Sequence, residues 1–179
     1  VGLNPTRCVL IKVLQSMGGK ITIQNNSVTC CEEVGDILVE SSRLEGVEIG
    51  GDIIPNIIDE IPILSIAASF AKGETSIKDA SELRVKESDR LSAISDGLHE
   101  IDISHELFED GIKIKGSQIN IIGNPKVNSY GDHRIAMSFL IASLRSENGI
   151  TVVNCKNIFT SFPNFTNLLK TLGVDIDET

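Results

Sequence analysis

Residues 82–95, ELRVKESDRLSAIS, place basic and acidic side chains close together. Within nine residues the run holds three groups of each sign: Glu82, Arg84, Lys86, Glu87, Asp89 and Arg90. Guanidinium and ammonium groups bind phosphates and carboxylates, and a carboxylate among cations stays ionised until a proton has to be moved. The run therefore suits an acid/base site for an anionic substrate. The alternative is a solvent-exposed ladder of salt bridges between residues four positions apart.

The local structure of the run decides which of these groups meet. The spacing predicts a helix that begins near Val85, with Glu87 in its first turn. Residues three or four apart share a helical face, so Lys86 and Glu87 can both converge on Arg90. The guanidinium fork of Arg90 would match a substrate carboxylate bidentately.

Asp59 lies just before the apolar residues 61–70. Its position, with Pro62 in the first turn, predicts a helix N-cap. A capping carboxylate is already held in a fixed orientation, so the same side chain can also serve in catalysis.

The motif GDHRIA, residues 131–136, opens a second apolar helix, which extends to residue 144. An unpaired buried Arg134 would be costly, so one interpretation pairs it with Asp132 or another carboxylate. The other interpretation is an anion site at the start of the helix, because helix N-termini attract negative charge.

The elements that must position these residues form an internal repeat. Residues 58–80 match residues 131–155: in both, an Asp comes before an apolar helix, a Gly lies near its end, and a strand starts at a Thr. An amphipathic helix recurs three times, in residues 10–17, 91–98 and 165–172. After these helices the sequence predicts the short strands KITI, EIDIS and GVDID, and SVTC, GVEIG, IKIKG and INIIG supply further strands.

The repeating unit is a strand, an apolar helix, a strand, an amphipathic helix and two strands, about 75 residues in all. Wholly apolar helices must be buried on every side, so they should pack together at the centre. We therefore predict an α/β (α+β) fold of repeated βαβαββ units, with buried parallel helices and outer mixed sheets. Residues 1–179 hold roughly two and a half units and open within one, so we expect a partial domain of a larger protein.

Composition narrows the possible functions. The 179 residues are 41% hydrophobic and 23% charged, as in globular proteins, and lack the roughly 18-residue apolar run of a membrane helix. A net charge of -9 argues against a nucleic-acid partner. The four cysteines have no CxxC spacing and share no ligand spacing with the three histidines, so we expect reduced thiols, a cytoplasmic protein and no metal site.

The segments LRVKESDRLSAI, IPNIIDEIPIL and YGDHRIAMSF resemble the C-terminal half of the 5-enolpyruvylshikimate-3-phosphate synthase family, and the likeness runs from Gly2 to Val174. The resemblance implies two domains of three βαβαββ units each, so that the N-terminal domain would be missing here. It implies a monomer without metal or organic cofactor that moves the enolpyruvyl group of phosphoenolpyruvate onto the 5-hydroxyl of shikimate 3-phosphate. The reaction passes through a tetrahedral intermediate and releases phosphate, as a step of aromatic amino acid biosynthesis.

The resemblance also implies roles for individual residues. Asp59 and Glu87 would be the catalytic pair: Asp59 contacts the attacking hydroxyl, and Glu87 handles the proton at the methylene carbon of phosphoenolpyruvate. Which carboxylate takes the hydroxyl proton stays open. The substrate-binding residues would be Lys86 for shikimate 3-phosphate, and Arg90, His133 and Arg134 for phosphoenolpyruvate.

Two positions depart from the enteric type of this family: Thr160 replaces a substrate-binding Lys, and Glu82 replaces an Asn. Both resemble the bacterial class that includes glyphosate-tolerant forms. The alternative interpretations are the sister enzyme that uses UDP-N-acetylglucosamine, an RNA-terminal phosphate cyclase, and a domain that binds its ligands but catalyses no reaction. The first lacks the RVKESDR run, and the second needs a surface for RNA that this acidic chain does not offer. We expect the isolated segment itself to be inactive.

Overall fold

The structure is a computed structural model that describes residues 1–178, and its elements follow the order of the predicted repeat. In chain order they are α1 (Val9–Ser16), β1 (Lys20–Thr29), β2 (Glu32–Glu40), β3 (Glu48–Ile49), η1 (Gly51–Ile53), α2 (Ile54–Ile57), α3 (Ile61–Ser69), β4 (Glu74–Ile77), η2 (Ser81–Val85), α4 (Arg90–Glu100), β5 (His105–Leu107), β6 (Ile112–Lys115), β7 (Lys126–Asn128), α5 (His133–Ala142), η3 (Ser143–Arg145), β8 (Thr151–Val153), α6 (Asn157–Ser161) and α7 (Phe165–Thr171). None of the helices within residues 1–178 is long and apolar enough to cross a membrane.

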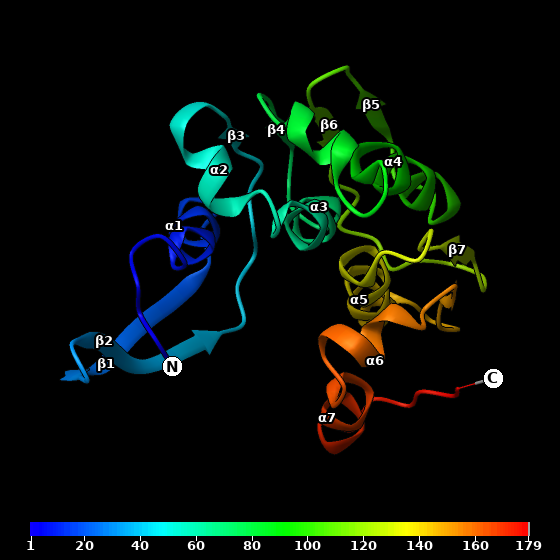
Figure 1. Ribbon diagram of the computed structural model, residues 1–179. Coiled ribbons are helices and arrows are strands. Elements are labelled where there is room, and N and C mark those ends of the chain that lie inside the picture. The colour runs from blue at the N-terminus through cyan, green and yellow to red at the C-terminus, as the bar shows by residue number, and fades with distance from the viewer. Residues whose placement is uncertain (179) are drawn as a thin grey trace.

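The apolar helices α3 and α5 lie side by side at the centre of the fold (Figure 1). Nearly the whole of α3 is buried, and α5 buries Ile135 and Phe139. The hydroxyls of Ser65 and Ser69 in α3 donate to backbone carbonyls four residues earlier, so these polar side chains can be buried at little cost. The predicted pair of buried helices is therefore confirmed.

The second unit is complete and forms a mixed sheet on the outside of these helices. The strand order is β3-β4-β6-β5, with β3 parallel to β4, and β6 antiparallel to both β4 and β5. The inward face of the sheet buries Ile77, Ile112 and Ile114. The parallel pair β7–β8 begins the third unit, and α1 with β1 and β2 supplies the end of the first.

The strand predicted at EIDIS is misplaced. α4 continues to Glu100, and the following strand, β5, starts only at His105. Ile101 and Ile103 are buried in the connection between the two. Their alternation therefore reflects anchoring of a loop to the core and not strand pairing.

The C-terminal predictions hold only in part. GVDID forms no strand within the described residues, and INIIG contributes a single bridge, from Ile121 to Ser146. α7 buries Leu169 but exposes 43% of Leu168 and 78% of Leu172. The apolar stripe predicted for this helix is therefore mostly uncovered here.

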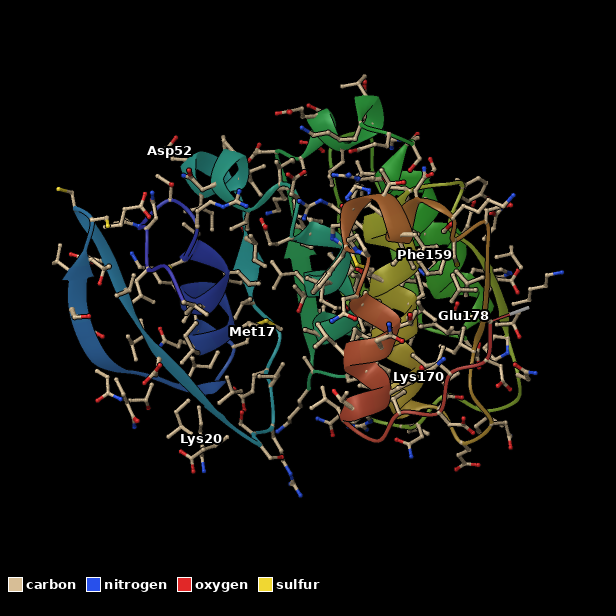
Figure 2. The ribbon with its side chains drawn as sticks, turned by 60° about the horizontal axis from the view of Figure 1, so that its bottom comes forward. Met17, Lys20, Asp52, Phe159, Lys170 and Glu178 are labelled. Carbon is tan, nitrogen blue, oxygen red and sulfur yellow. The ribbon has the colours of Figure 1, made fainter. Side chains whose placement is uncertain are left out.

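The hairpin of β1 and β2 stands at one edge of the molecule, with α1 beside it (Figure 2). It pairs the predicted KITI and SVTC segments with β2, and almost all its side chains are exposed. Cys30 and Cys31 form its two-residue turn, both with positive φ, as tight hairpin turns of this length require. The cysteines are not bonded to one another as disulfides.

An apolar groove of about 670 Å³ separates this hairpin unit from the central helices. Leucine side chains of α1 line one wall, and α3 and the end of α5 line the other. The apolar residues that line it are Leu10, Leu14, Leu44, Ile63, Leu64, Ile66, Ala67, Phe70, Ile141 and Leu144.

Candidate active site

The charged run of residues 82–90 is a turn and not the predicted helix face. Residues 81–85 form the short helix η2, and α4 begins only at Arg90. Asp89 is its N-cap and accepts a hydrogen bond from the backbone N–H of Ser92 at 3.1 Å. The predicted helix start near Val85 is therefore wrong, because the Asp89 cap starts the helix later. Lys86 and Glu87 consequently lie in a turn, where they face different partners.

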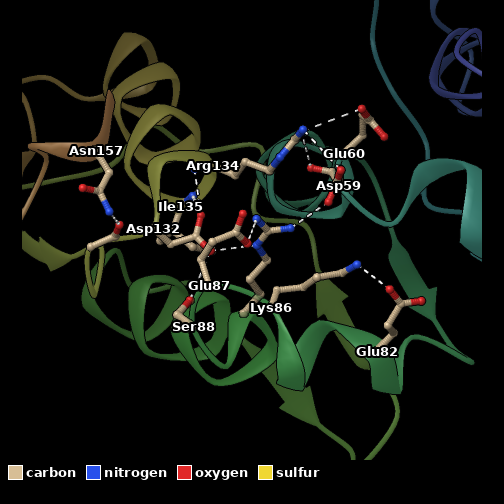
Figure 3. Close-up of polar contacts among 12 residues, drawn as sticks. Asp59, Glu60, Glu82, Lys86, Glu87, Ser88, Asp132, Arg134, Ile135 and Asn157 are labelled. Atoms are coloured by element: carbon tan, nitrogen blue, oxygen red, sulfur yellow. Dashed lines mark hydrogen bonds and ion pairs between the residues drawn. The ribbon is translucent and has the colours of Figure 1, made fainter. Parts of the chain in front are cut away.

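Arg90 is the centre of the site, and it is buried, with 1% of its side chain exposed. Its guanidinium donates from each of its three nitrogens to a different carboxylate (Figure 3). Nη1 lies 2.9 Å from Asp59 Oδ1, and Nη2 lies 2.5 Å from Glu87 Oε2. Nε lies 2.7 Å from Asp132 Oδ2. The fold therefore brings Asp59 and Glu87 to one point, as the sequence predicted.

These ionic contacts keep Arg90 positively charged. Burial alone would lower its pKa, but the hydrogen bond and charge of Asp132, together with Asp59 and Glu87, raise the pKa above its usual value. A buried guanidinium is tolerated only with such complete pairing.

Asp59 does not cap α3, so the N-cap prediction is wrong. The N-cap position is Glu60, and no side chain caps this helix. The Asp59 carboxylate instead contacts two arginines: Oδ1 accepts from Arg90, and Oδ2 lies 3.3 Å from Nη2 of Arg134. The carboxylate is therefore paired with two fully charged guanidinium groups, and the backbone N–H groups at the start of α3 have no side-chain cap.

The same contacts set the ionisation of Asp59. Partial burial would raise the pKa of this carboxyl, but the hydrogen bond from Arg90 and the charges of Arg134, Arg90 and Lys86 outweigh it. The pKa of Asp59 therefore lies below its usual value, and the group is a carboxylate at neutral pH.

Arg134 does not pair with Asp132 through its side chain. Its Nη1 donates to the backbone carbonyl of Asp59 at 2.9 Å and lies 3.8 Å from Glu60 Oε1. Asp132 accepts the backbone N–H of Arg134 instead, which leaves the guanidinium at the start of α5, 29% exposed. The first interpretation, an ion pair, therefore holds with Asp59 as the partner. The exposed part of the Arg134 guanidinium can still bind an anion, as the second interpretation requires.

Lys86 and His133 lie at the margin of this cluster. The ammonium of Lys86 pairs with Glu82, whose carboxylate is 59% exposed (Figure 3). His133 is half-buried at the first position of α5, and its ring makes no hydrogen bond or ion pair within residues 1–178. Thr160 is exposed on α6, so it does not join the Arg90 cluster.

Arg84 and Asp132 make contacts that the sequence did not predict. Arg84 faces away from the cluster, donates to the backbone carbonyls of Phe108 and Glu109, and pairs with Asp89 at 2.9 Å. It therefore fastens η2 to the loop between β5 and β6. Asp132, considered only as a partner of Arg134, instead accepts from Arg90; its equivalence to Asp59 in the repeat was the available signal.

Metal ligands do not gather in this region. Within residues 1–178 no group of three or more His, Cys, Asp or Glu side chains is arranged to hold a metal ion. The three carboxylates of the site are engaged with a guanidinium.

The arrangement supplies two kinds of chemistry. Two carboxylates, Asp59 and Glu87, are 36% and 50% exposed and lie on one guanidinium, so both can exchange protons with a bound molecule. Lys86 and Arg134 add positive charge beside them, which suits a substrate that carries phosphate or carboxylate groups.

Comparison with known proteins places the chain in one family. Residues 1–169 match the family model for EPSP synthase (3-phosphoshikimate 1-carboxyvinyltransferase). The 3-phosphoshikimate 1-carboxyvinyltransferase of Geotalea daltonii is 49% identical over 97% of this chain and 40% of its own length. That of Petrotoga mobilis is 52% identical over 95% of this chain and 39% of its own length. This chain thus spans about 40% of the length of these curated relatives.

Solved structures agree with this assignment. An EPSP synthase from Acinetobacter baumannii superposes with a TM-score of 0.90 and 41% identity, over 96% of this chain and 40% of that one. The enolpyruvyl transferase NikO from Streptomyces tendae, at 19% identity and a TM-score of 0.72, shares the fold, with 97% of this chain and 36% of that one covered. The predicted enolpyruvyl transferase fold of repeated units is therefore confirmed, and this chain belongs to the EPSP synthase family.

Proposed function

We propose that residues 1–179 are part of a longer enzyme that transfers the enolpyruvyl group of phosphoenolpyruvate to the 5-hydroxyl of shikimate 3-phosphate. The relatives' length supports the first half of this proposal, since the chain spans about 40% of them. The observation that carries the second half is the joint hold of Arg90 on Asp59 and Glu87. We place the enzyme in the cytoplasm, in aromatic amino acid biosynthesis, as a monomer.

In the addition step, the hydroxyl oxygen of shikimate 3-phosphate forms a bond to C2 of phosphoenolpyruvate. Asp59 takes the hydroxyl proton, and Glu87, which starts the cycle in its protonated form, gives that proton to the methylene carbon, C3. Asp59 can take this proton because it is ionised at neutral pH. The product is a tetrahedral intermediate that still carries the phosphate.

In the elimination step, Glu87 takes back one proton from the new methyl carbon, and the bond between C2 and the phosphate oxygen breaks. The proton held by Asp59 leaves with the phosphate. Both carboxyl groups therefore return to their starting states, and the enolpyruvyl ether and inorganic phosphate are the products.

The cations of the site bind different anionic groups of the two substrates. Arg134 presents its exposed edge to the carboxylate of phosphoenolpyruvate, next to His133. Arg90 uses three of its five N–H donors on protein carboxylates and is only 1% exposed, so the substrate carboxylate would reach its other two donors after Asp59 or Glu87 moves aside. When the substrate binds, Lys86 leaves its ion pair with the exposed Glu82 and contacts the phosphate or a hydroxyl of shikimate 3-phosphate.

Glu87→Gln in the full-length enzyme tests the proposal. Glutamine keeps the size of the side chain but cannot carry the C3 proton, so turnover should fall by about 100-fold or more. The measurement is phosphate release with both substrates present. Glu106→Gln, on the exposed strand β5, is the matched control and should keep the wild-type rate.

Two results would count against the proposal. Wild-type turnover in Glu87→Gln would remove Glu87 from the chemistry. Failure of the wild-type enzyme to release phosphate with shikimate 3-phosphate, but release with UDP-N-acetylglucosamine as the acceptor, would assign the protein to the sister reaction.

A further inference from the structure

Asp132 is a fully buried carboxylate whose contacts all lead to the candidate active site. Its Oδ1 atom accepts hydrogen bonds from the backbone N–H groups of Arg134, at 2.8 Å, and Ile135, at 3.4 Å. Its Oδ2 atom accepts from Nε of Arg90, at 2.7 Å, and from the hydroxyl of Ser88, at 3.3 Å (Figure 3). One oxygen therefore serves the start of α5, and the other serves the turn before α4 and its first residue.

The cap made by Oδ1 does not explain the Oδ2 contacts. The helices α1, α3 and α7 all begin without a side-chain cap, so the fold does not require one at each helix. A serine or asparagine would also cap α5, because either supplies one acceptor oxygen. What these residues lack is a second, charged oxygen for Arg90.

The bond to Oδ2 controls the direction in which Arg90 points. A guanidinium is planar and rigid, so a partner on Nε fixes where Nη1 and Nη2 lie. Those two nitrogens hold the carboxylates of Asp59 and Glu87. Without Asp132, Arg90 would keep only Asp59 and Glu87 as partners, on Nη1 and Nη2. The plane of the guanidinium could then rotate together with these two carboxylates.

We propose that Asp132 is a positioning residue, which acts through Arg90 to hold Asp59 and Glu87 in the geometry for proton transfer. The proposal rests on the proposed function, since its readout is that reaction. Asp132 itself, with no exposed surface, does not meet a substrate.

The test is a double-mutant cycle in the full-length enzyme, with kcat/KM for phosphoenolpyruvate as the readout. Asp132→Asn has a single acceptor oxygen: when this oxygen caps α5, the NH2 group faces Arg90. We expect a loss of about 100-fold, the size that a misplacement of about 1 Å produces in an active site. Arg90→Lys removes the fork itself and should lose at least as much.

The double variant separates positioning from general damage to the fold. If Asp132 acts through Arg90, Asp132→Asn should cost about threefold or less when Arg90 is already Lys. Losses that multiply would show that the two residues act independently and would overturn the proposal. A single variant Asp132→Asn within about twofold of wild type would overturn it as well.

Asp132→Ser is the second variant, in case the asparagine does not fold. Serine is a good N-cap, so α5 should still form, while the charged oxygen is gone. It should show the same loss and the same coupling to Arg90→Lys. Full activity in a folded Asp132→Ser enzyme would contradict the proposal.

Ser129→Ala is the matched structural control. Ser129 is buried just before α5, and its hydroxyl donates to the carbonyls of Val153 and Asn154, both at 2.9 Å. Its loss should lower the melting temperature but keep kcat/KM within about twofold, with or without Arg90→Lys. A wild-type enzyme with no transfer of enolpyruvate to shikimate 3-phosphate would refute the proposed function instead, before any variant is compared.

Discussion

Arg90 carries a full charge into the core, and three acids surround it. Such a group is stable only when every partner is present, because loss of one leaves an uncompensated buried charge. The same contacts hold Asp59 and Glu87, the two carboxylates to which we assign proton transfer, at one place. Stability and chemistry therefore depend on the same few hydrogen bonds, and variants at these positions should affect both.

Asp59 should make the stability of the enzyme dependent on acid. Its native pKa lies below its value of about 3.9 in an unfolded chain, so its contribution is present above that pH and is lost as the pH falls through the native pKa. We expect the free energy of unfolding to decrease below about pH 4 and Asp59→Asn to lack this part of the decrease. Urea unfolding from about pH 3 to pH 7 measures both. Parallel curves for the two proteins would contradict the expectation.

At the scale of single residues, the sequence indicated which residues form the site better than it indicated the contacts between them. Glu87 and Arg90 were singled out because charges of both signs at short spacing are unusual in an otherwise acidic chain, and Asp59 because of its place before an apolar helix. The structure brings these three side chains together, and their catalytic roles stay a prediction. The bond from Arg90 to Asp132 was missed, because it joins residues from two units and no spacing within one segment reveals it. The N-cap at Asp59 was wrong because a contact from α5, not the local sequence, decides its partner.

The helices were predictable where burial alone determines them. α3 and α5 are apolar on all sides, and only a central position can accommodate that pattern. The start of α4 was not predictable from periodicity, since the N-cap Asp89, four residues after Val85, determines it. Likewise the alternation in Ile101 and Ile103 is the same for a strand and for a buried loop.

The close packing of α4 on α5 can be tested by a substitution at their contact. A Cβ atom on Gly97 would lie 2.1 Å from Cζ of Phe139. Alanine normally stabilises a helix relative to glycine by about 1 kcal/mol, but here overpacking should cost about 1–3 kcal/mol. Urea unfolding of Gly97→Ala should therefore show a loss of stability.

His99→Ala is the control for this substitution, because His99 is exposed on the same helix. Its free energy of unfolding should change by less than about 0.5 kcal/mol. Replacing Phe139 by Leu in the Gly97→Ala background should recover part of the loss. A more stable Gly97→Ala protein would show that the two helices can move apart.

The whole molecule leaves apolar surface uncovered on the side of α1. The groove beside α3 and the exposed hairpin of β1 and β2 both lie there. In the second unit β6, one of the two strands equivalent to this hairpin, pairs with β4, and the apolar helix α3 precedes β4. If a longer protein supplies a strand and an apolar helix for the first unit, as we propose, we expect them to cover the groove and extend the sheet.

We predict that residues 1–179 alone release no measurable phosphate from the two substrates. The chain supplies cations and carboxylates from one side of the substrates, and such reactions need groups on both sides and exclusion of water. The assay compares the segment with the full-length enzyme at equal concentration, and a dye that binds apolar surface should bind the segment more strongly. Turnover by the segment would contradict this prediction.

Asp59 and Asp132 occupy the same place in successive units, and one guanidinium holds both. A solitary ancestral unit would have had one such aspartate and no neighbour to share it with. The cluster could thus arise only once two copies stood next to each other, by gene duplication or by association of separate chains. In this chain the two equivalent carboxylates differ in exposure: the Asp59 side chain is 36% exposed, whereas Asp132 is fully buried.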